Sequence, residues 1–140
     1  MQKEIITSGK APTTGFTAGQ ATSPLAQAIR MGGLLFVSGQ GPLDPETRTV
    51  VDGDITVQTR RTLDNLRNVL DAGGADFTRV ANMRVMLRHA EDFSAFNDTF
   101  RDYMQGEKVT RTCIVATPHR PGVNVEIDCI AVLDQPGGAA

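Results

Sequence analysis

The sequence predicts an α+β domain in which one mixed β-sheet carries two helices on a single face. Three observations lead to this class. Strand-like and helix-like segments follow one another in the order β-β-β-α-β-α-β-β, only two segments have an amphipathic helical period, and several strands carry apolar residues on both faces. The 140 residues are the length of one ordinary domain. We therefore expect residues 1–140 to form a single domain.

The N-terminal region is predicted to contain three short strands and one long loop. Residues 1–24 hold a strand at 3–7 and an extended loop rich in Gly, Thr, Ser and Pro. Strands are expected at 26–30 and 34–38, with Gly32-Gly33 between them as a hairpin turn. The run LLFV has no polar alternate position, so we expect both of its faces to be buried.

Two helices and three further strands follow. Asp54 is the expected N-cap of a helix over 55–72, which Gly73-Gly74 ends. The segment RVANMRVMLR alternates as a strand does, with Ala81 and Met83 on one side. A second helix, capped by Asp92, is expected to place an aromatic stripe on one face. Strands are expected at 110–117 and 124–133, and a flexible tail over 135–140. The stripe consists of Phe93, Phe96, Phe100, Tyr103 and Met104.

Two helices cannot cover both faces of such a sheet. The strand over 124–133 places Val125 and Ile127 on one side but also Ile130 and Val132 on the other. An apolar face that its own chain leaves bare is most economically covered by another copy. We therefore expect a closed homo-oligomer.

The composition limits the class of function. A formal net charge of −2 gives no electrostatic reason to bind phosphate backbones, which disfavours nucleic acid as a partner. With no apolar run of membrane-spanning length and no secretory signal, we expect a cytoplasmic protein. The two cysteines, Cys113 and Cys129, are predicted to be buried free thiols, and the two histidines, His89 and His119, do not support a metal site, so no metal is expected.

Arg111 is the most informative candidate residue, because a guanidinium is unusual within a strand such as TRTCIVA. The period of two places Arg111 and Cys113 on one face, and it groups Asn124, Glu126 and Asp128 on one face of the last strand. An adjacent strand could thus bring a carboxylate to Arg111 as a structural salt bridge. The alternative is that its planar fork binds a substrate carboxylate, contributing roughly 1.5–3 kcal/mol.

Three other residues have both a functional and a structural interpretation. Ser38 precedes Gly39, where the backbone can approach a ligand, but a Ser-Gly pair is also common turn chemistry. Asn97 borders the aromatic stripe, either lining a pocket or satisfying a loop. Cys113 has no histidine on its strand, which argues against a covalent cysteine mechanism.

Taken together, the motifs LLFVSGQGPLDPET, LDNLRNVLDAGG, FSAFNDTF, TRTC and VEIDCIAV closely resemble the Rid family of reactive-intermediate deaminases. This family is also called YjgF or, in older naming, the L-PSP endoribonuclease family. The resemblance covers about residues 24–134. It implies a chorismate-mutase-like fold and a homotrimer with a central β-barrel, with clefts at the subunit boundaries.

The resemblance also implies an activity and a site. The reaction is hydrolysis of 2-imino acids or enamines to 2-keto acids and ammonium, as in 2-iminobutanoate/2-iminopropanoate deaminases, with no cofactor. Arg111 would hold the substrate carboxylate, and Thr112 follows it where many members have serine. Glu126 and the backbone carbonyl of Cys113 would hold or polarise the attacking water, while Ser38 and Asn97 line the cleft.

One position departs from the family pattern. Deaminating members commonly read G-P-Y-[SV]-Q before the first long strand, whereas this chain reads SPLAQ, so that Leu25 replaces the tyrosine in the substrate pocket. The pocket loses a hydroxyl and becomes more apolar. The preceding loop is longer than usual, which makes Phe16 and Thr17 candidates to enter the pocket instead. A larger or more apolar imine is the hypothesis that follows.

Three rival functions remain open from the sequence. A pathway-specific member would act on another enamine, of the aminoacrylate or aminomuconate type. A non-catalytic small-ligand-binding or chaperone-like trimer would retain the arginine without turnover. Ribonuclease activity, suggested by the older family name, is disfavoured by the acidic balance and by the absence of an evident pair of histidines.

Overall fold

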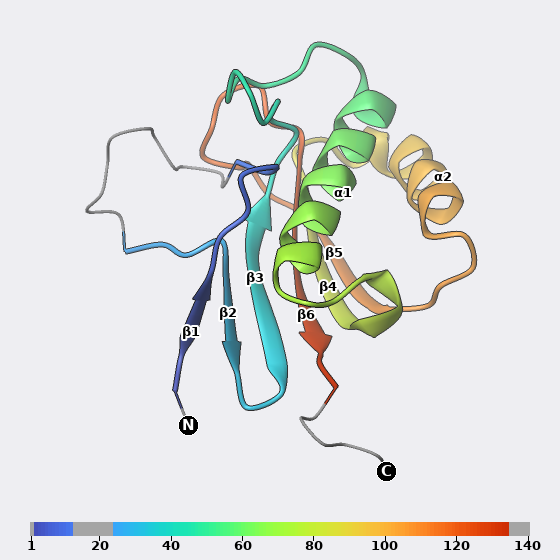
Figure 1. The fold of residues 1–140 in the computed structure, drawn as a ribbon. Helices are drawn as coiled ribbons and strands as arrows, with labels where there is room; N and C mark the ends of the chain where they lie inside the picture. The colour runs from blue at the N-terminus through green and yellow to red at the C-terminus, as the bar shows by residue number, and fades with distance from the viewer. Residues whose placement is uncertain (1, 13–23, 135–140) are drawn as a thin grey trace.

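The computed structural model describes residues 2–12 and 24–134, where a single six-stranded sheet carries both α-helices on one face (Figure 1). The strand order is β1-β2-β3-β6-β4-β5, and every neighbouring pair is antiparallel except the parallel pair β4 and β5. The predicted mixed sheet with two helices on one face is confirmed. The strands are β1 Glu4–Ile6, β2 Ala28–Met31, β3 Leu34–Gln40, β4 Val80–Leu87, β5 Thr110–Val115 and β6 Val125–Val132.

The hairpin between β2 and β3 turns at Gly32-Gly33, as predicted. Both glycines have positive φ, 61° and 77°, which is the backbone of a two-residue turn that matches the twist of the flanking strands. Met31 consequently pairs with Leu34. β1 then adds to the outer edge of β2, where Arg30 and Glu4 form an ion pair at 2.8 Å.

Helix α1, Ile55–Ala72, begins at the predicted cap and ends at Gly73. The Asp54 carboxylate accepts a hydrogen bond from the Val57 amide at 3.0 Å, satisfying one of the unpaired donors of the first turn. The buried face of the helix is polar in part. Asn65 donates to the carbonyls of Gly41 at 3.0 Å and Leu43 at 2.9 Å, so it fixes the loop that leaves β3.

Helix α2, Phe93–Met104, buries most of the predicted stripe against the sheet. Phe96 is fully buried, whereas Phe93 stays 43% exposed. Asp92 is the N-cap residue of this helix, as predicted, but its side chain makes no capping hydrogen bond. The 3₁₀ turn η2, Ala90–Asp92, runs directly into the helix and gives Asp92 a helical backbone instead of the extended one that a cap uses.

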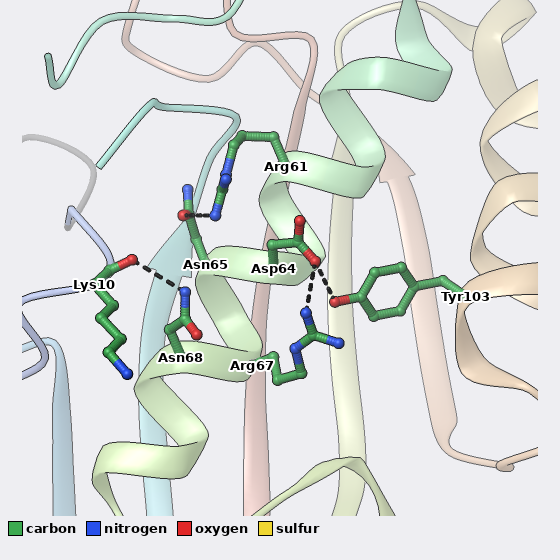
Figure 2. Close-up of polar contacts among 7 residues, drawn as sticks. All are labelled: Lys10, Arg61, Asp64, Asn65, Arg67, Asn68 and Tyr103. Carbon is green, nitrogen blue, oxygen red and sulfur yellow. Dashed lines mark hydrogen bonds and ion pairs between the residues drawn. The ribbon is translucent and has the colours of Figure 1, made fainter. Parts of the chain in front are cut away.

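The two helices are joined by a polar contact on their outer sides (Figure 2). The Tyr103 hydroxyl of α2 donates to the Asp64 carboxylate of α1 at 2.6 Å, and Arg67 donates to the same oxygen at 3.2 Å. One turn further along α1, Asn68 donates to the carbonyl of Lys10 at 3.1 Å. The N-terminal segment is thereby held against the helix layer.

Strand β4 departs from strict alternation at its start. A register shift separates Val80 from Asn82, just after the 3₁₀ turn η1, Phe77–Arg79. Val80 is buried and Ala81 is exposed, so the prediction that Ala81 shares the side of Met83 is wrong. From Met83 onward the alternation holds, because the bulge has ended and one face packs on the helices.

No helix of the described residues covers the opposite face of the sheet (Figure 1). Phe36 is 43% exposed, Ile114 52% and Val132 44%. The expectation that both faces of LLFV are buried is therefore wrong within one chain, since Leu35 and Val37 meet the helices and Phe36 does not. For β6 the predicted alternation is confirmed: its helix-facing residues Val125, Ile127, Cys129 and Ala131, together with Leu133, are all buried. Self-association through this face stays a prediction.

Candidate functional site

Arg111 lies on β5, the strand at one edge of the sheet. It pairs with Met83 of β4, and paired residues on neighbouring strands direct their side chains to the same face. Met83 is fully buried beneath the helices, so the Arg111 side chain also lies on the helix side. There the guanidinium Nη2 donates to the Asn97 side-chain oxygen at 2.9 Å. The structure thus brings together two of the predicted site residues.

An aromatic surface surrounds this guanidinium. The Arg111 Cζ lies 4.9 Å from the ring centroid of Phe100, 5.6 Å from that of Phe96 and 5.9 Å from that of Phe93. A cavity of about 630 Å³ adjoins Arg111 and reaches Met104, Lys108 and Val109. In the part of the chain that the structure describes, no carboxylate forms an ion pair with Arg111.

Cys113 shares the face of Arg111, as the period of two predicts, because it pairs with Val85 of β4. Burial raises the pKa of the Cys113 thiol, and the nearby Arg111 charge lowers it by less. Cys129 lies deeper, where burial raises the pKa of its thiol to about 12. Both cysteines are free thiols, as predicted, although Cys113 is only partly buried. A protonated, partly covered thiol is a poor nucleophile.

The predicted approach of a β6 carboxylate to Arg111 is wrong within one chain. β4 lies between β5 and β6, and Glu126 pairs with Met86, which in turn pairs with Ile114. Glu126 is therefore on the uncovered face, opposite to Arg111. Asp128 lies on that same face and forms a two-pronged contact with Arg84, at 2.9 Å for each hydrogen bond. The structural salt bridge considered for Arg111 is instead made by Arg84.

Ser38, Gly39 and Glu126 form a second group, on the uncovered face. The Ser38 hydroxyl donates to the Ala26 carbonyl at 2.6 Å, and a register shift between Val37 and Gln40 marks a bulge at this point of β3. A Cβ on Gly39 would stand 2.5 Å from the Glu126 Oε2, so the carboxylate rests directly on the glycine backbone. The approach of a ligand to Gly39 stays a prediction; within the chain, the group that lies against its backbone is the Glu126 carboxylate.

Leu25 lies just before β2 and is 53% exposed. It lines a cavity of about 270 Å³ together with Ser38 and Phe36. Leu25 therefore belongs to the group on the uncovered face and not to that of Arg111. Phe16 and Thr17, the other candidates for this pocket, lie outside the described residues.

His119, on the loop after β5, is a residue that the sequence had not assigned to the site; Arg88 holds this loop in place. The Arg88 guanidinium donates to the carbonyls of Val123 at 3.1 Å and of Pro118 and Arg120 at 3.3 Å, which clamps residues 118–123. This loop carries His119. Burial raises the pKa of Glu126, and the positive form of His119 opposes that rise. The two prolines flanking His119 indicate a defined loop, but no local pattern predicts its position beside Glu126.

Residues 2–12 and 24–134 contain neither a candidate metal site nor a candidate membrane span. No group of three or more His, Cys, Asp or Glu side chains in these ranges is arranged to hold a metal ion. None of their helices is both long enough and apolar enough to cross a membrane.

Comparisons with known proteins agree on one family. The family model described as Endoribonuclease L-PSP matches residues 16–133. A RutC family protein of Pyrococcus abyssi is 34% identical over 131 residues, covering 94% of this chain and 98% of that protein. A 2-iminobutanoate/2-iminopropanoate deaminase of Capra hircus is 33% identical over 130 residues, covering 93% of this chain and 90% of that protein.

Solved structures give the same answer for the fold. The Rid family protein YyfA of Yersinia pestis superposes with a TM-score of 0.84 at 31% identity, covering 94% of this chain and 100% of that one. The Escherichia coli protein TdcF, crystallised with bound serine, superposes with a TM-score of 0.80 at 27% identity, covering 92% of this chain and 98% of that one. Both similarities extend over nearly the whole described fold.

Proposed function

Because the chain belongs to the endoribonuclease L-PSP family, also named the Rid or YjgF family, we propose that it hydrolyses 2-imino acids and their enamine tautomers to 2-keto acids and ammonium. The observation that carries the proposal is the Arg111 guanidinium, which lies beside a cavity with no carboxylate of the described chain bound to it. A planar fork of N–H donors matches the two oxygens of a small carboxylate. The relative that contains bound serine supports a ligand of amino-acid size.

We further propose that the site forms between copies in a homotrimer. Arg111, Asn97 and Cys113 lie on the helix side at the β5 edge, whereas Ser38, Glu126 and Leu25 lie on or beside the uncovered face. One chain cannot join the two groups, because the sheet separates them. A second copy packed on the uncovered face would bring its β5 edge to Ser38 and Glu126, and it would cover Phe36 and Ile114.

The proposed chemistry needs a held water and a group that takes up and returns a proton. A water oxygen adds to the imine carbon while Glu126 accepts one of its protons and the imine nitrogen takes one from solvent, which gives a neutral carbinolamine. Glu126 then returns its proton to the carbinolamine nitrogen, the C–N bond breaks to release ammonia, and the hydroxyl proton passes to solvent, which leaves the 2-keto acid and the starting carboxylate. Burial raises the pKa of Glu126, which makes its carboxylate a stronger base than an exposed glutamate. Arg111 holds the substrate without taking part in proton transfer.

The test is an assay of imine hydrolysis with Arg111 variants. 2-Iminobutanoate and 2-iminopropanoate are generated in situ with an amino-acid oxidase, and the disappearance of the imine is followed. Loss of a charged hydrogen-bond pair worth roughly 1.5–3 kcal/mol predicts that Arg111→Ala lowers kcat/KM by roughly 10- to 150-fold. Arg111→Lys keeps the charge but loses the fork, so it should recover little of this activity.

Arg67→Ala serves as the control, because Arg67 lies on the outer side of α1 and contacts Asp64 and Tyr103 (Figure 2). It should keep the wild-type rate. Activity that survives Arg111→Ala would end the proposal that Arg111 anchors the carboxylate. Tight binding of 2-keto acids with no turnover by the wild-type protein would favour the rival function of a non-catalytic ligand-binding protein.

A further inference from the structure

Three aromatic residues of α2 surround the Arg111 guanidinium. All three ring centroids lie within 6 Å of the guanidinium carbon, at 4.9 Å for Phe100, 5.6 Å for Phe96 and 5.9 Å for Phe93. This is the range in which the negative face of an aromatic ring attracts a cation. The three residues come from successive turns of one helix, so a single rigid element presents them.

The position of Phe93 indicates that a ring here serves Arg111 and not the packing of the core. Phe96 and Phe100 are buried members of the hydrophobic core, and their positions are explained by packing. Phe93 is 43% exposed and lies outside that core. An exposed phenylalanine ring beside a guanidinium adds little to core packing, yet it shields the cation from water.

Asn97 fixes the rotation of the Arg111 guanidinium between these rings. Rings can hold the guanidinium in place but do not select its rotation, whereas the 2.9 Å hydrogen bond from Nη2 to the Asn97 oxygen occupies one of its five N–H donors. Among the described residues, Asn97 is the guanidinium's one hydrogen-bond partner. The other donors remain for a ligand in the adjoining cavity.

We propose that Phe93, Phe96 and Phe100 are positioning residues that form a cage around Arg111, and that with Asn97 they orient its open edge toward a ligand carboxylate. The inference rests on the proposed function, since it assumes that Arg111 binds a carboxylate. A preordered guanidinium loses less side-chain freedom when the ligand binds. The cage therefore acts on substrate binding and leaves the hydrolytic step to other groups.

The first test separates KM from kcat. Phe93→Leu keeps an apolar side chain but removes the ring, and Phe93→Tyr keeps the ring. Loss of one cation–π contact predicts that Phe93→Leu raises KM by roughly 2- to 30-fold with little change in kcat. Phe93→Tyr should restore the wild-type KM. Phe77→Leu is the matched control, because its ring packs edge-on against Tyr103 and not against Arg111; its KM should be unchanged.

The second test does not depend on catalysis. The order parameter of the Arg111 Nε–H bond, measured by ¹⁵N relaxation in the unliganded protein, should fall in Phe93→Leu and stay high in wild type and Phe93→Tyr. If wild-type protein neither binds nor hydrolyses imino acids, the proposed function fails, and the order parameter alone then decides on the cage. Unchanged order in Phe93→Leu overturns the cage, whether or not KM rises, because the ring then does not hold the guanidinium.

Discussion

Substitution of Gly39 by alanine tests the position of Glu126 without removing its carboxylate. The new Cβ would stand 2.5 Å from Oε2, 3.0 Å from Cδ and 3.2 Å from Cγ of Glu126. Ordinary contact begins at 3.4 Å, so the carboxylate must retreat by about 0.9 Å. The backbone itself tolerates alanine, since Gly39 does not have a positive φ. We therefore expect a displaced carboxylate in an otherwise intact fold.

The expected magnitudes for activity and stability differ widely. A misplacement of about 1 Å in a reacting group can lower a rate on the order of 100-fold, which corresponds to about 2.7 kcal/mol of activation free energy. The free energy of unfolding should change by less than about 1 kcal/mol, because alanine is favoured over glycine inside a strand by roughly 0.5–1 kcal/mol. That gain offsets the cost of turning the end of a flexible side chain.

The assay measures kcat on 2-iminobutanoate together with urea denaturation of the same preparations. Gly9→Ala is the matched control, because a Cβ there meets no atom within 4 Å and Gly9 has no positive φ. It should keep the wild-type rate and stability. A Gly39→Ala protein that is folded and retains wild-type kcat would refute the assignment of Glu126 as the base, since its carboxylate would then be free to move without consequence.

Two further predictions concern stability. Burial raises the pKa of Glu126 in the folded state above its unfolded value, so its contribution to stability is greatest below the unfolded pKa near 4.5 and is lost as pH rises through the folded value. Glu126→Gln should therefore flatten this part of the pH profile of the free energy of unfolding, measured by urea titration. An unchanged slope would contradict the burial argument. Tyr103→Phe removes the 2.6 Å hydrogen bond to Asp64 and should lower the free energy of unfolding by roughly 1.5–3 kcal/mol, whereas imine hydrolysis, measured beside it, should not change.

Much of the fold could be predicted because local patterns determine it. The alternation of β6 identifies its buried side, and Asp54 together with Gly73 marks the ends of α1. The errors lie where neighbouring structure overrides the local pattern. The bulge at Ala81 shifts one residue to the other face, and the 3₁₀ turn before α2 gives Asp92 a helical backbone, so that its side chain makes no capping hydrogen bond.

The candidate site could be predicted only in pieces. The period of two correctly grouped Arg111 with Cys113, because faces follow from the pleat of one strand. It could not show that β4 separates β5 from β6, since strand order depends on contacts between distant segments. The separation of Arg111 from Glu126 is therefore a property of topology. The contact of Gly39 with Glu126 was likewise hidden, because it joins residues of different strands.

The clamp that Arg88 makes on the loop of residues 118–123 has a consequence for how this protein can diversify. Its three hydrogen bonds all reach main-chain carbonyls, so the clamp makes no use of the His119 side chain. Mutation at position 119 can then alter the charge beside Glu126 while the backbone stays in place. An exchange of this one residue would thus change the electrostatic environment of the Glu126 carboxylate without rebuilding the loop.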